Sequence, residues 1–283
     1  MVIPRRWLRT LSLSKCRNHR RRNLQQKQRT ENREQKTENK EQRTKNKEQR
    51  TNLLQQKNNI VKLYLIPTPI GNLEDITMRA LRVLKEVDMV FCEDTRTTGN
   101  LLRHYGIEQK CYPYHIHNEH QTLEKTIAMI KSVGSVALTS DAGTPAISDP
   151  GFLLVRECLK EGIEVECLPG ATALIPALVN SGLPCDSFYF HGFLPHKKRK
   201  ESTLKKLAEM DCTVMFYESP YRLLKTLEMM VEPFGGDRRL SVARELTKIH
   251  EENFRGTISE AIQYFCQKAV KGEIVVVVEG KGS

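Results

Sequence analysis

The stretch from Leu138 to Gly151 carries the densest set of residues that could do chemistry. It reads L-T-S-D-A-G-T-P-A-I-S-D-P-G and holds two Asp, two Gly and two Pro within fourteen positions. An apolar run precedes it and a helical pattern follows from Phe152, so a strand should open into this loop and end at a helix N-terminus. Such a loop brings backbone N–H groups against a polar ligand. The pattern therefore predicts a ligand site, and a surface loop is the plainer alternative.

Other candidate loops follow other apolar runs. Lys62–Ile66 predicts a buried strand, and it leads into the rigid segment P-T-P-I-G-N. Asp88–Cys92 predicts a second strand, which ends in E-D-T-R, and charged groups recur in E-S-P-Y-R and A-R-E-L-T-K. Because open α/β sheets bind ligands at the carboxyl ends of their strands, these motifs should face one crevice. A helix-dipole contact or an interdomain ion pair is the structural alternative for each acid.

Strand and helix patterns alternate from residue 61 onward, which predicts an α/β fold. We expect a unit at 61–180 and a second at 181–283, with the candidate loops in a cleft between them. The unbroken β-branched run Glu273–Gly280 predicts a central strand buried on both faces. Thr77 should cap the helix that begins at Met78, and Ser148 or Asp149 should cap the helix that begins at Phe152.

The net charge of +11 comes from the first sixty residues. Residues 1–60 hold 18 Lys and Arg against 5 Asp and Glu, whereas the rest of the chain holds 27 against 29. The near-neutral body therefore gives no indication of nucleic-acid binding. Residues 29–49 repeat a polar heptad with no apolar position, which argues against a coiled coil and predicts disorder. A transit peptide, a basic RNA-tethering arm and a true start near Val61 are three open explanations of this tail.

Cysteine and histidine positions give no pattern typical of a metal site. The eight Cys form no C-x-x-C and indicate reduced thiols in a cytosolic protein. His115, His117 and His120 lack an acid or Cys at ligand spacing, so we expect no metal. No run of eighteen apolar residues predicts a membrane span. For the basic run His196–Lys200, a solvated helix face and an RNA-phosphate contact are both open.

Taken in order, these motifs resemble the ribosomal RNA small-subunit methyltransferase I family. The match covers T-P-I-G-N-L-E-D-I-T, E-D-T-R-T-T, S-D-A-G-T-P-A-I-S-D-P-G, P-G-A-T-A, H-G-F-L-P, E-S-P-Y-R, A-R-E-L-T-K and G-E-I-V-V-V-V-E-G, from about Leu63 to Gly280. Two departures are that the chain stops at Ser283, where many members continue with a helical segment, and that Tyr221 replaces the usual His.

The resemblance implies the tetrapyrrole-methylase fold, with two α/β domains and a cleft between them. It implies S-adenosyl-L-methionine as cofactor and methylation of a cytidine ribose 2′-hydroxyl in the decoding centre of 16S rRNA. The implied partners are the 30S subunit and a second copy of the chain, in the cytoplasm. Two other functions are open: a tetrapyrrole C-methyltransferase on the same fold, and a non-enzymatic RNA-binding protein of ribosome assembly.

The resemblance also implies which residues line the cofactor, and Asp141 could accept a hydrogen bond from a cofactor hydroxyl or amine. The full set is Pro69, Gly71, Ser140, Asp141, Ala142, Gly143, Ile147, Pro169, Gly170 and Ala171. A ribose hydroxyl is a weak nucleophile, so a base or a cation at the developing alkoxide should help. The strand ends offer Glu93, Asp94, Glu218 and Glu245 as candidate bases, and Arg96, Arg244 and Lys248 as cations that could hold a phosphate or the alkoxide.

Overall fold

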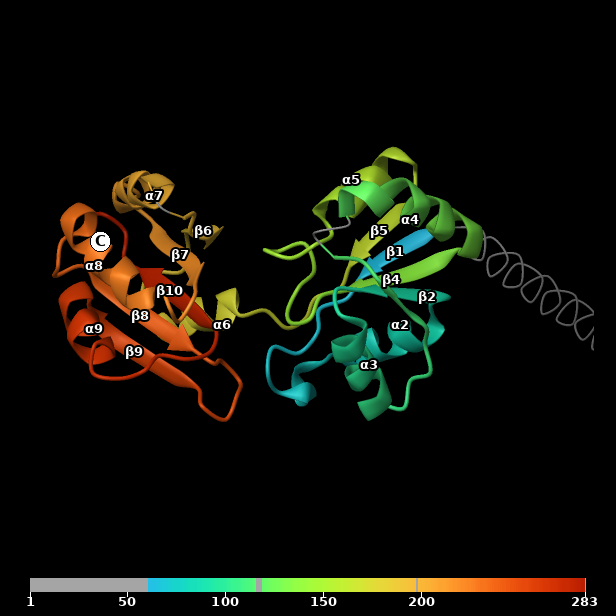
Figure 1. Cartoon of the computed structure of the whole chain (residues 1–283), viewed down its shortest axis with the longest axis horizontal. Helices are drawn as coiled ribbons and strands as arrows, with labels where there is room; N and C mark the ends of the chain where they lie inside the picture. Colours follow the sequence, from blue (N-terminus) through green and yellow to red (C-terminus); the bar gives the residue numbers. More distant parts are fainter. Residues whose placement is uncertain (1–60, 116–118, 197, 283) are drawn as a thin grey trace, which may run out of the picture. The chain divides into compact units, whose positions relative to one another are not determined.

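The computed structural model of the chain describes residues 61–115, 119–196 and 198–282 (Figure 1). The predicted disordered tail at 1–60 and its three explanations lie outside these residues. So do His117 and the other residues of 116–118, on which part of the histidine motif falls. Within the described residues no helix is long and apolar enough to cross a membrane.

The first half of the described chain forms a sheet in which every pair of neighbouring strands is parallel, as the strand–helix alternation predicts. The strand order is β3-β2-β4-β1-β5. The elements are β1 (Lys62–Leu65), η1 (Leu73–Asp75), α2 (Met78–Glu86), β2 (Met89–Cys92), α3 (Thr95–His104), β3 (Cys111–Pro113), α4 (Glu119–Val133), β4 (Ser135–Thr139), α5 (Phe152–Lys160) and β5 (Glu164–Cys167).

Helices cover both faces of this sheet. Figure 1 shows α4 and α5 on one face and α2 and α3 on the other. Each pair of helices closes its own apolar cluster against the strands. Leu65 of β1 pairs with Leu138 of β4, and Cys92 of β2 pairs with Thr139 of β4. The last residues of these three strands are therefore neighbours, and the loops that follow them leave the sheet at one edge.

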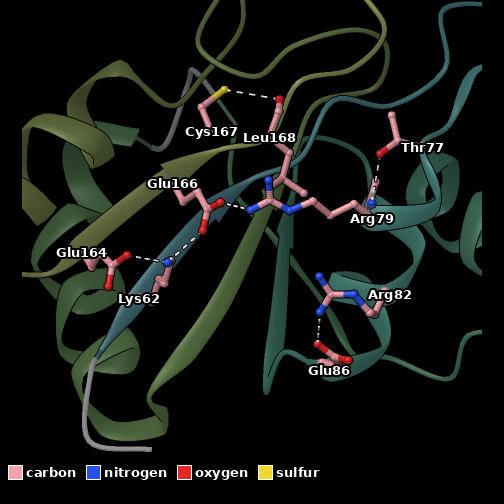
Figure 2. Close-up of polar contacts among 10 residues, drawn as sticks. Lys62, Thr77, Arg79, Arg82, Glu86, Glu164, Glu166, Cys167 and Leu168 are labelled. Carbon is pink, nitrogen blue, oxygen red and sulfur yellow. Dashed lines mark hydrogen bonds and ion pairs between the residues drawn. The ribbon is translucent and has the colours of Figure 1, made fainter. Parts of the chain in front are cut away.

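The exposed edge of this sheet, at β5, is covered by ion pairs. Figure 2 shows the Glu166 carboxylate between Lys62 and Arg79, with Lys62 also paired to Glu164. The Lys62 Nζ lies 2.8 Å from Glu166 Oε2. Charged side chains along an edge strand oppose pairing with another chain, because such pairing would desolvate them.

The second half forms a mixed sheet of order β6-β7-β10-β8-β9. Only β6 and β7 pair in parallel there, and the other neighbours are antiparallel. The elements are α6 (Leu174–Ser181), β6 (Phe188–Phe193), α7 (Lys198–Ala208), β7 (Thr213–Glu218), α8 (Leu223–Phe234), β8 (Arg239–Arg244), β9 (Glu252–Thr257), α9 (Ile258–Phe265) and β10 (Ile274–Val278).

Strand β10 is central and buried at every residue, as its β-branched run predicts. Helices α7, α8 and α9 share one apolar cluster with it. Helix α6 packs on the other face of this sheet, where Ala177 and Leu178 meet Val275 and Val277. The proposed boundary between residues 180 and 181 therefore falls at the end of a helix that packs on the second sheet.

The predicted helix cap at Thr77 is confirmed, because its side chain accepts a hydrogen bond from the Ala80 N–H. The predicted cap of α5 is wrong. Gly151 occupies the N-cap position, with φ +135° and no side-chain cap, and neither Ser148 nor Asp149 stands there. A Cβ on Gly151 would lie 2.9 Å from Leu138 Cδ2, and side chains disfavour this φ, so both the packing and the backbone favour glycine at this position.

Candidate active site

Hydrogen bonds hold together three of the predicted ligand loops, which follow β1, β4 and β5. Thr68 and Gly143 exchange two backbone hydrogen bonds, each 2.9 Å long, and form an isolated antiparallel bridge. The Thr68 hydroxyl also donates to the Ser140 carbonyl, at 3.1 Å. The Thr144 hydroxyl donates to the Ala171 carbonyl, at 3.2 Å. The first two loops are about seventy residues apart in the sequence, and the second and third are about thirty apart. Their hydrogen bonds make them one rigid unit.

A cavity of about 350 Å³ opens beside this unit. Its size lies within the usual range of small-molecule sites. Residues from both sheets line it, and the carboxyl-bearing ones include Glu93, Asp141 and Asp149 from the first half. The apolar lining comes from Ile70, Ala142, Ile147, Phe193, Ala243, Leu246, Ile274 and Val275, and Tyr217 also contributes.

A second hollow of about 490 Å³ adjoins the first. The two share Ile70, Asp141, Ala142 and Glu273 in their walls. Of the predicted cofactor residues, Asp141 and Ala142 line both spaces, Gly143 and Ile147 line the first, and Pro69, Gly71 and Ser140 line the second. Pro169, Gly170 and Ala171 stand outside both linings, although the Ala171 carbonyl anchors Thr144.

The carboxylates from the first half of the chain crowd one another. The Asp94 N–H donates to Asp141 Oδ1 at 3.1 Å, and the Asp141 N–H lies 3.4 Å from Glu93 Oε2. Burial raises the pKa values of Glu93 and Asp141. Burial, with the nearby charge of Glu93, raises the pKa of Asp149 to about 7. Where these carboxyls are ionised they give the cavity wall a negative potential, which favours a positively charged ligand.

Backbone strain accompanies these carboxylates. Ala146 and Ser148 have φ values of +71° and +64°, in the left-handed region that side chains disfavour. Such residues cost about 1–3 kcal/mol each, and they persist where the surrounding structure holds them, often at functional sites. Here the two strained residues bracket Ile147 and precede Asp149, and all three of Ile147, Ser148 and Asp149 line the cavity.

Glu218, from the second half, has a different environment. Its side chain is fully buried, and Lys200 Nζ and Arg222 each pair with it at 2.7 Å. The Thr226 hydroxyl donates to it at 2.7 Å and the Ser219 N–H at 2.8 Å. Glu218 borders the cavity, yet these cations and donors saturate its oxygens.

Glu245 and Lys248 lie in a loop that reaches the first half of the chain. Lys248 Nζ pairs with Glu245 Oε1 and with Glu273 Oε2, each at 2.9 Å. A hydrogen bond from the Glu273 N–H, together with Lys248, lowers the pKa of Glu245. Lys248 lines the second hollow, whereas Glu245 faces a separate open depression. The Asn72 N–H donates to the Thr247 hydroxyl at 3.1 Å, which joins the two halves here.

Arg244 is also held, because its Nε pairs with Glu252 Oε2 at 2.8 Å. Asp94 and Arg96 stand outside both cavity linings. Asp94 caps α3 by accepting from the Arg96 N–H, at 2.8 Å. The Arg96 guanidinium pairs with the same carboxylate at 2.7 Å, and this contact lowers the pKa of Asp94 to about 2. The helix N-terminus alternative thus describes Asp94, whereas Arg96 makes a local ion pair with the same carboxylate and not an interdomain one.

The cavity-lining residues that sequence reasoning did not identify as site residues include Asp149, Phe193, Tyr217 and Glu273. The sequence predicts Asp149 as a candidate helix cap, and no sequence signal indicates that its carboxyl lines the cavity. Burial, with the charges of Asp149 and Glu273, raises the pKa of Tyr217 to about 12. The aromatic residues gave no signal, because β-strand aromatics usually belong to a core.

The basic run at 196–200 does not present all of its charges to solvent. Lys200 is 6% exposed and pairs with Glu218, so neither the solvated-face nor the RNA-contact interpretation holds for this residue. No cluster of His, Cys, Asp or Glu that could hold a metal occurs among the described residues. The seven Cys in the described ranges are all free thiols, and Cys167, Cys185 and Cys266 are exposed.

The chain is similar in sequence to proteins of a known family. Residues 62–262 match the profile of the family described as Tetrapyrrole (Corrin/Porphyrin) Methylases. The chain is 48% identical over 220 residues to Ribosomal RNA small subunit methyltransferase I of Thermotoga maritima, across 78% of this chain and 99% of that protein. It is 50% identical over 223 residues to the protein of the same name from Hydrogenobaculum sp., across 77% and 95%.

Solved structures with low sequence identity share the fold. The cobalt precorrin-4 methyltransferase has a TM-score of 0.58 and 18% identity, over 77% of this chain and 95% of that one. The uroporphyrin III C-methyltransferase from Thermus thermophilus has a TM-score of 0.56 and 17% identity, over 77% and 97%. These likenesses show the two-sheet methylase fold, and the closer sequence matches go further. The chain therefore belongs to the ribosomal RNA small subunit methyltransferase I family, within the tetrapyrrole methylases.

Proposed function

We propose that this chain transfers a methyl group from S-adenosyl-L-methionine to the ribose 2′-hydroxyl of a cytidine in the decoding centre of 16S rRNA. It would act in the cytoplasm as a homodimer, with the 30S subunit as its substrate. The observation that carries this proposal is the convergence of three tied loops on a carboxylate-lined cavity, in a chain whose relatives are named for ribosomal RNA methylation.

The residues around the cavity fit the proposed cofactor. Ile70, Ala142 and Leu246 offer an apolar wall for a planar ring and a methyl group. Asp141 and Glu93 offer acceptors for the ribose hydroxyls and the ammonium of the cofactor. The negative potential of the carboxylates also favours a sulfonium cation over its neutral, demethylated product.

Bound S-adenosyl-L-methionine supplies an electrophilic methyl carbon, so that a carbon–sulfur bond breaks as a carbon–oxygen bond forms. The protein must align the hydroxyl with that carbon, which can contribute about 7–11 kcal/mol. It must also take the proton that the 2′-hydroxyl loses. A general base works best when its pKa lies near the working pH.

Asp149 meets this requirement best among the carboxylates at the cavity. Its pKa of about 7 makes it a stronger proton acceptor than an ordinary carboxylate, and it is still largely ionised slightly above neutrality. Glu93 lies close enough for its charge to help raise that pKa. We therefore propose Asp149 as the base, with Glu93 as the neighbour that tunes it.

The other base candidates are less suited to this role. Cations and hydrogen-bond donors occupy Glu218, and the pKa of Glu245 is lowered. Asp94 has a pKa of about 2 and caps a helix. A carboxylate stabilised in its ionised form is a weak proton acceptor.

The proposal is tested by incubating 30S particles that lack their native methyl groups with the protein and labelled S-adenosyl-L-methionine. We expect label in 16S rRNA, and a primer-extension stop at one decoding-centre cytidine that requires both protein and cofactor. Label at a base carbon, label on a tetrapyrrole in place of RNA, or binding to 30S without turnover would each contradict the proposal.

The cofactor site has its own test. Asp141→Asn should weaken the binding of S-adenosyl-L-methionine in calorimetry, because it removes a charge that faces both hollows. An unchanged dissociation constant would refute this placement. Asp186→Asn serves as a matched control, because Asp186 is exposed and lies outside both linings.

A further inference from the structure

A bulge in β6 lies beside the cavity. In the pairing of β6 with β7, Phe190 lies opposite Met215, and the next pair is Phe193 opposite Tyr217. Three steps along β6 therefore match two along β7, so β6 contains one extra residue. Gly192 within it has φ +76°, which a side chain disfavours. Bulges near active sites commonly re-aim a side chain, and this one places Phe193 against Tyr217.

The bulge brings two phenylalanine rings to one tyrosine. Phe190 and Phe193 both pack edge-to-face on Tyr217, with ring centroids 4.9 and 5.4 Å away. Phe193 and Tyr217 both line the 350 Å³ cavity. Phe193 is nevertheless 55% exposed. A residue that both lines a cavity and reaches solvent stands where the cavity opens, so the Phe193 ring lies at the entrance.

Tyr217 connects this entrance to the carboxylates. Its ring packs on Phe193, while the charges of Asp149 and Glu273 act on its phenol group. Phe193, Tyr217 and Asp149 therefore line one cavity, with the Phe193 ring at its entrance and the proposed base in its wall.

We propose that Phe193 is the stacking platform for the unpaired pyrimidine base whose ribose is methylated. This inference rests on the proposed function and names how its substrate is held. Enzymes that modify one nucleotide take its base out of the helical stack, and aromatic side chains stabilise the extruded base. The carboxylates behind Phe193 repel phosphate groups, so a neutral base and its ribose are favoured in the cavity over the charged phosphates. The exocyclic amine of cytosine can donate a hydrogen bond to such a carboxylate.

The test compares Phe193→Leu, which keeps an apolar side chain and removes the aromatic face, with Phe193→Tyr, which keeps the ring. Phe188→Leu is the matched control, since Phe188 lies on the same strand, is 38% exposed and stands outside the cavity lining. With 30S particles and saturating cofactor, Phe193→Leu should lower kcat/KM about ten- to a hundred-fold. Phe193→Tyr and Phe188→Leu should stay within a few-fold of the wild type.

Calorimetry with S-adenosyl-L-methionine identifies which molecule the ring contacts. We expect the same cofactor dissociation constant for the wild type and Phe193→Leu. If the loss of cofactor affinity equals the loss of kcat/KM, the ring holds the cofactor and the proposal is overturned. Equal losses of kcat/KM in Phe193→Leu and Phe188→Leu would overturn the proposal as well, because any exposed phenylalanine of the strand would then have the same effect.

A binding assay separates this inference from the proposed function. A fluorescent RNA hairpin with the decoding-centre loop is prepared with either cytidine or an abasic ribose at the target position. The wild type should bind the cytidine form about tenfold more tightly, and Phe193→Leu should bind both forms equally. This result, in a protein that fails to methylate 30S particles, would refute the proposed function and leave the stacking site. Equal binding of both forms by the wild type would refute the stacking site.

Discussion

The carboxylates of the two halves of the chain follow strands in similar motifs, yet they lie in opposite electrostatic environments. Glu93, Asp141 and Asp149, from the first half, crowd one cavity, and their pKa values are raised. Glu218 and Glu245, from the second half, are each paired with lysine. Binding a proton or a cation would stabilise the carboxylates of the first group. The charges of the second group are already balanced by lysine.

This difference indicates a division of work between the halves. Unpaired acids in a partly buried site are costly to the fold and useful for chemistry, because their charge can still change. Acids that are already paired with cations hold segments of the chain in place instead. Glu218 ties α7, β7 and α8 together through Lys200 and Thr226, immediately before the Ser219–Pro220 turn that lines the cavity. The predictions below test this division, from the largest expected effect to the smallest.

Asp149→Asn should have the largest effect, because it removes the proposed base. We expect methyl transfer to fall about 10²–10⁴-fold. Stability should move the other way. A carboxyl whose folded pKa lies above its unfolded value destabilises the fold once the pH exceeds the unfolded value, and the penalty grows until the pH passes about 7. Asn removes this penalty, so urea unfolding at pH 8 should show equal or greater stability. A variant with reduced stability and normal turnover would contradict the division.

Lys200→Met should be the most damaging substitution for stability. It leaves a buried carboxylate short of a cation, and such losses cost about 3–5 kcal/mol in the free energy of unfolding. The double variant with Glu218→Gln should recover part of that loss. Lys205→Met is the matched control on the same helix, where the lysine pairs with exposed Glu201, and it should leave the unfolding midpoint unchanged. Equal effects of the two lysine variants would show that the Glu218 network is not a stabilising anchor.

Glu93→Gln should shift the pH dependence of the reaction. Wild-type turnover should rise with pH through about 7 as Asp149 ionises. Removing the charge of Glu93 makes that ionisation easier, so the midpoint of the kcat profile should move to lower pH. Glu86→Gln, which removes an exposed acid paired with Arg82 on α2, should leave the profile in place. A Glu93→Gln midpoint at or above the wild-type value would exclude Glu93 as the group that tunes the base.

From the sequence, the loops that carry these acidic residues could be predicted better than the residues with which the acids pair. Apolar runs locate β1, β2, β4 and β10, so the loops that follow them could be found from the residues alone. The partner of Glu218 could not, because Lys200 lies eighteen positions away in a run that resembles a solvated face. Strand β9 cannot be predicted from its residues, because E-N-F-R-G-T has no apolar alternation and pairing with β8 defines the strand. The inward turn of Asp149 depends on strained backbone at Ser148, which no propensity indicates.

Arg96→Ala should have the smallest effect, since the Arg96 side chain is 88% exposed and its ion pair with Asp94 is at the surface. Loss of the guanidinium should let the pKa of Asp94 rise from about 2 toward its usual range, which NMR titration can follow. The stabilisation from this pair is present above the unfolded pKa of Asp94 and is lost as the pH falls through the folded value. Above pH 5 the variant should therefore be slightly less stable than the wild type, and this difference should disappear as the pH falls through about 2.

The same substitution tests whether Arg96, one of the candidate cations, contacts a phosphate of the RNA. One lost phosphate contact should reduce the slope of log affinity for 30S particles against log salt by about 1, with kcat unchanged. Arg103→Ala is the control on the same helix, where the arginine bonds to Asn100. An unchanged slope would leave Arg96 as the partner of Asp94 alone. A large fall in kcat would place Arg96 at the reacting atoms. The Asp94–Arg96 pair would then belong to the active site, and the distinction between acids that line the cavity and acids paired at the surface would fail.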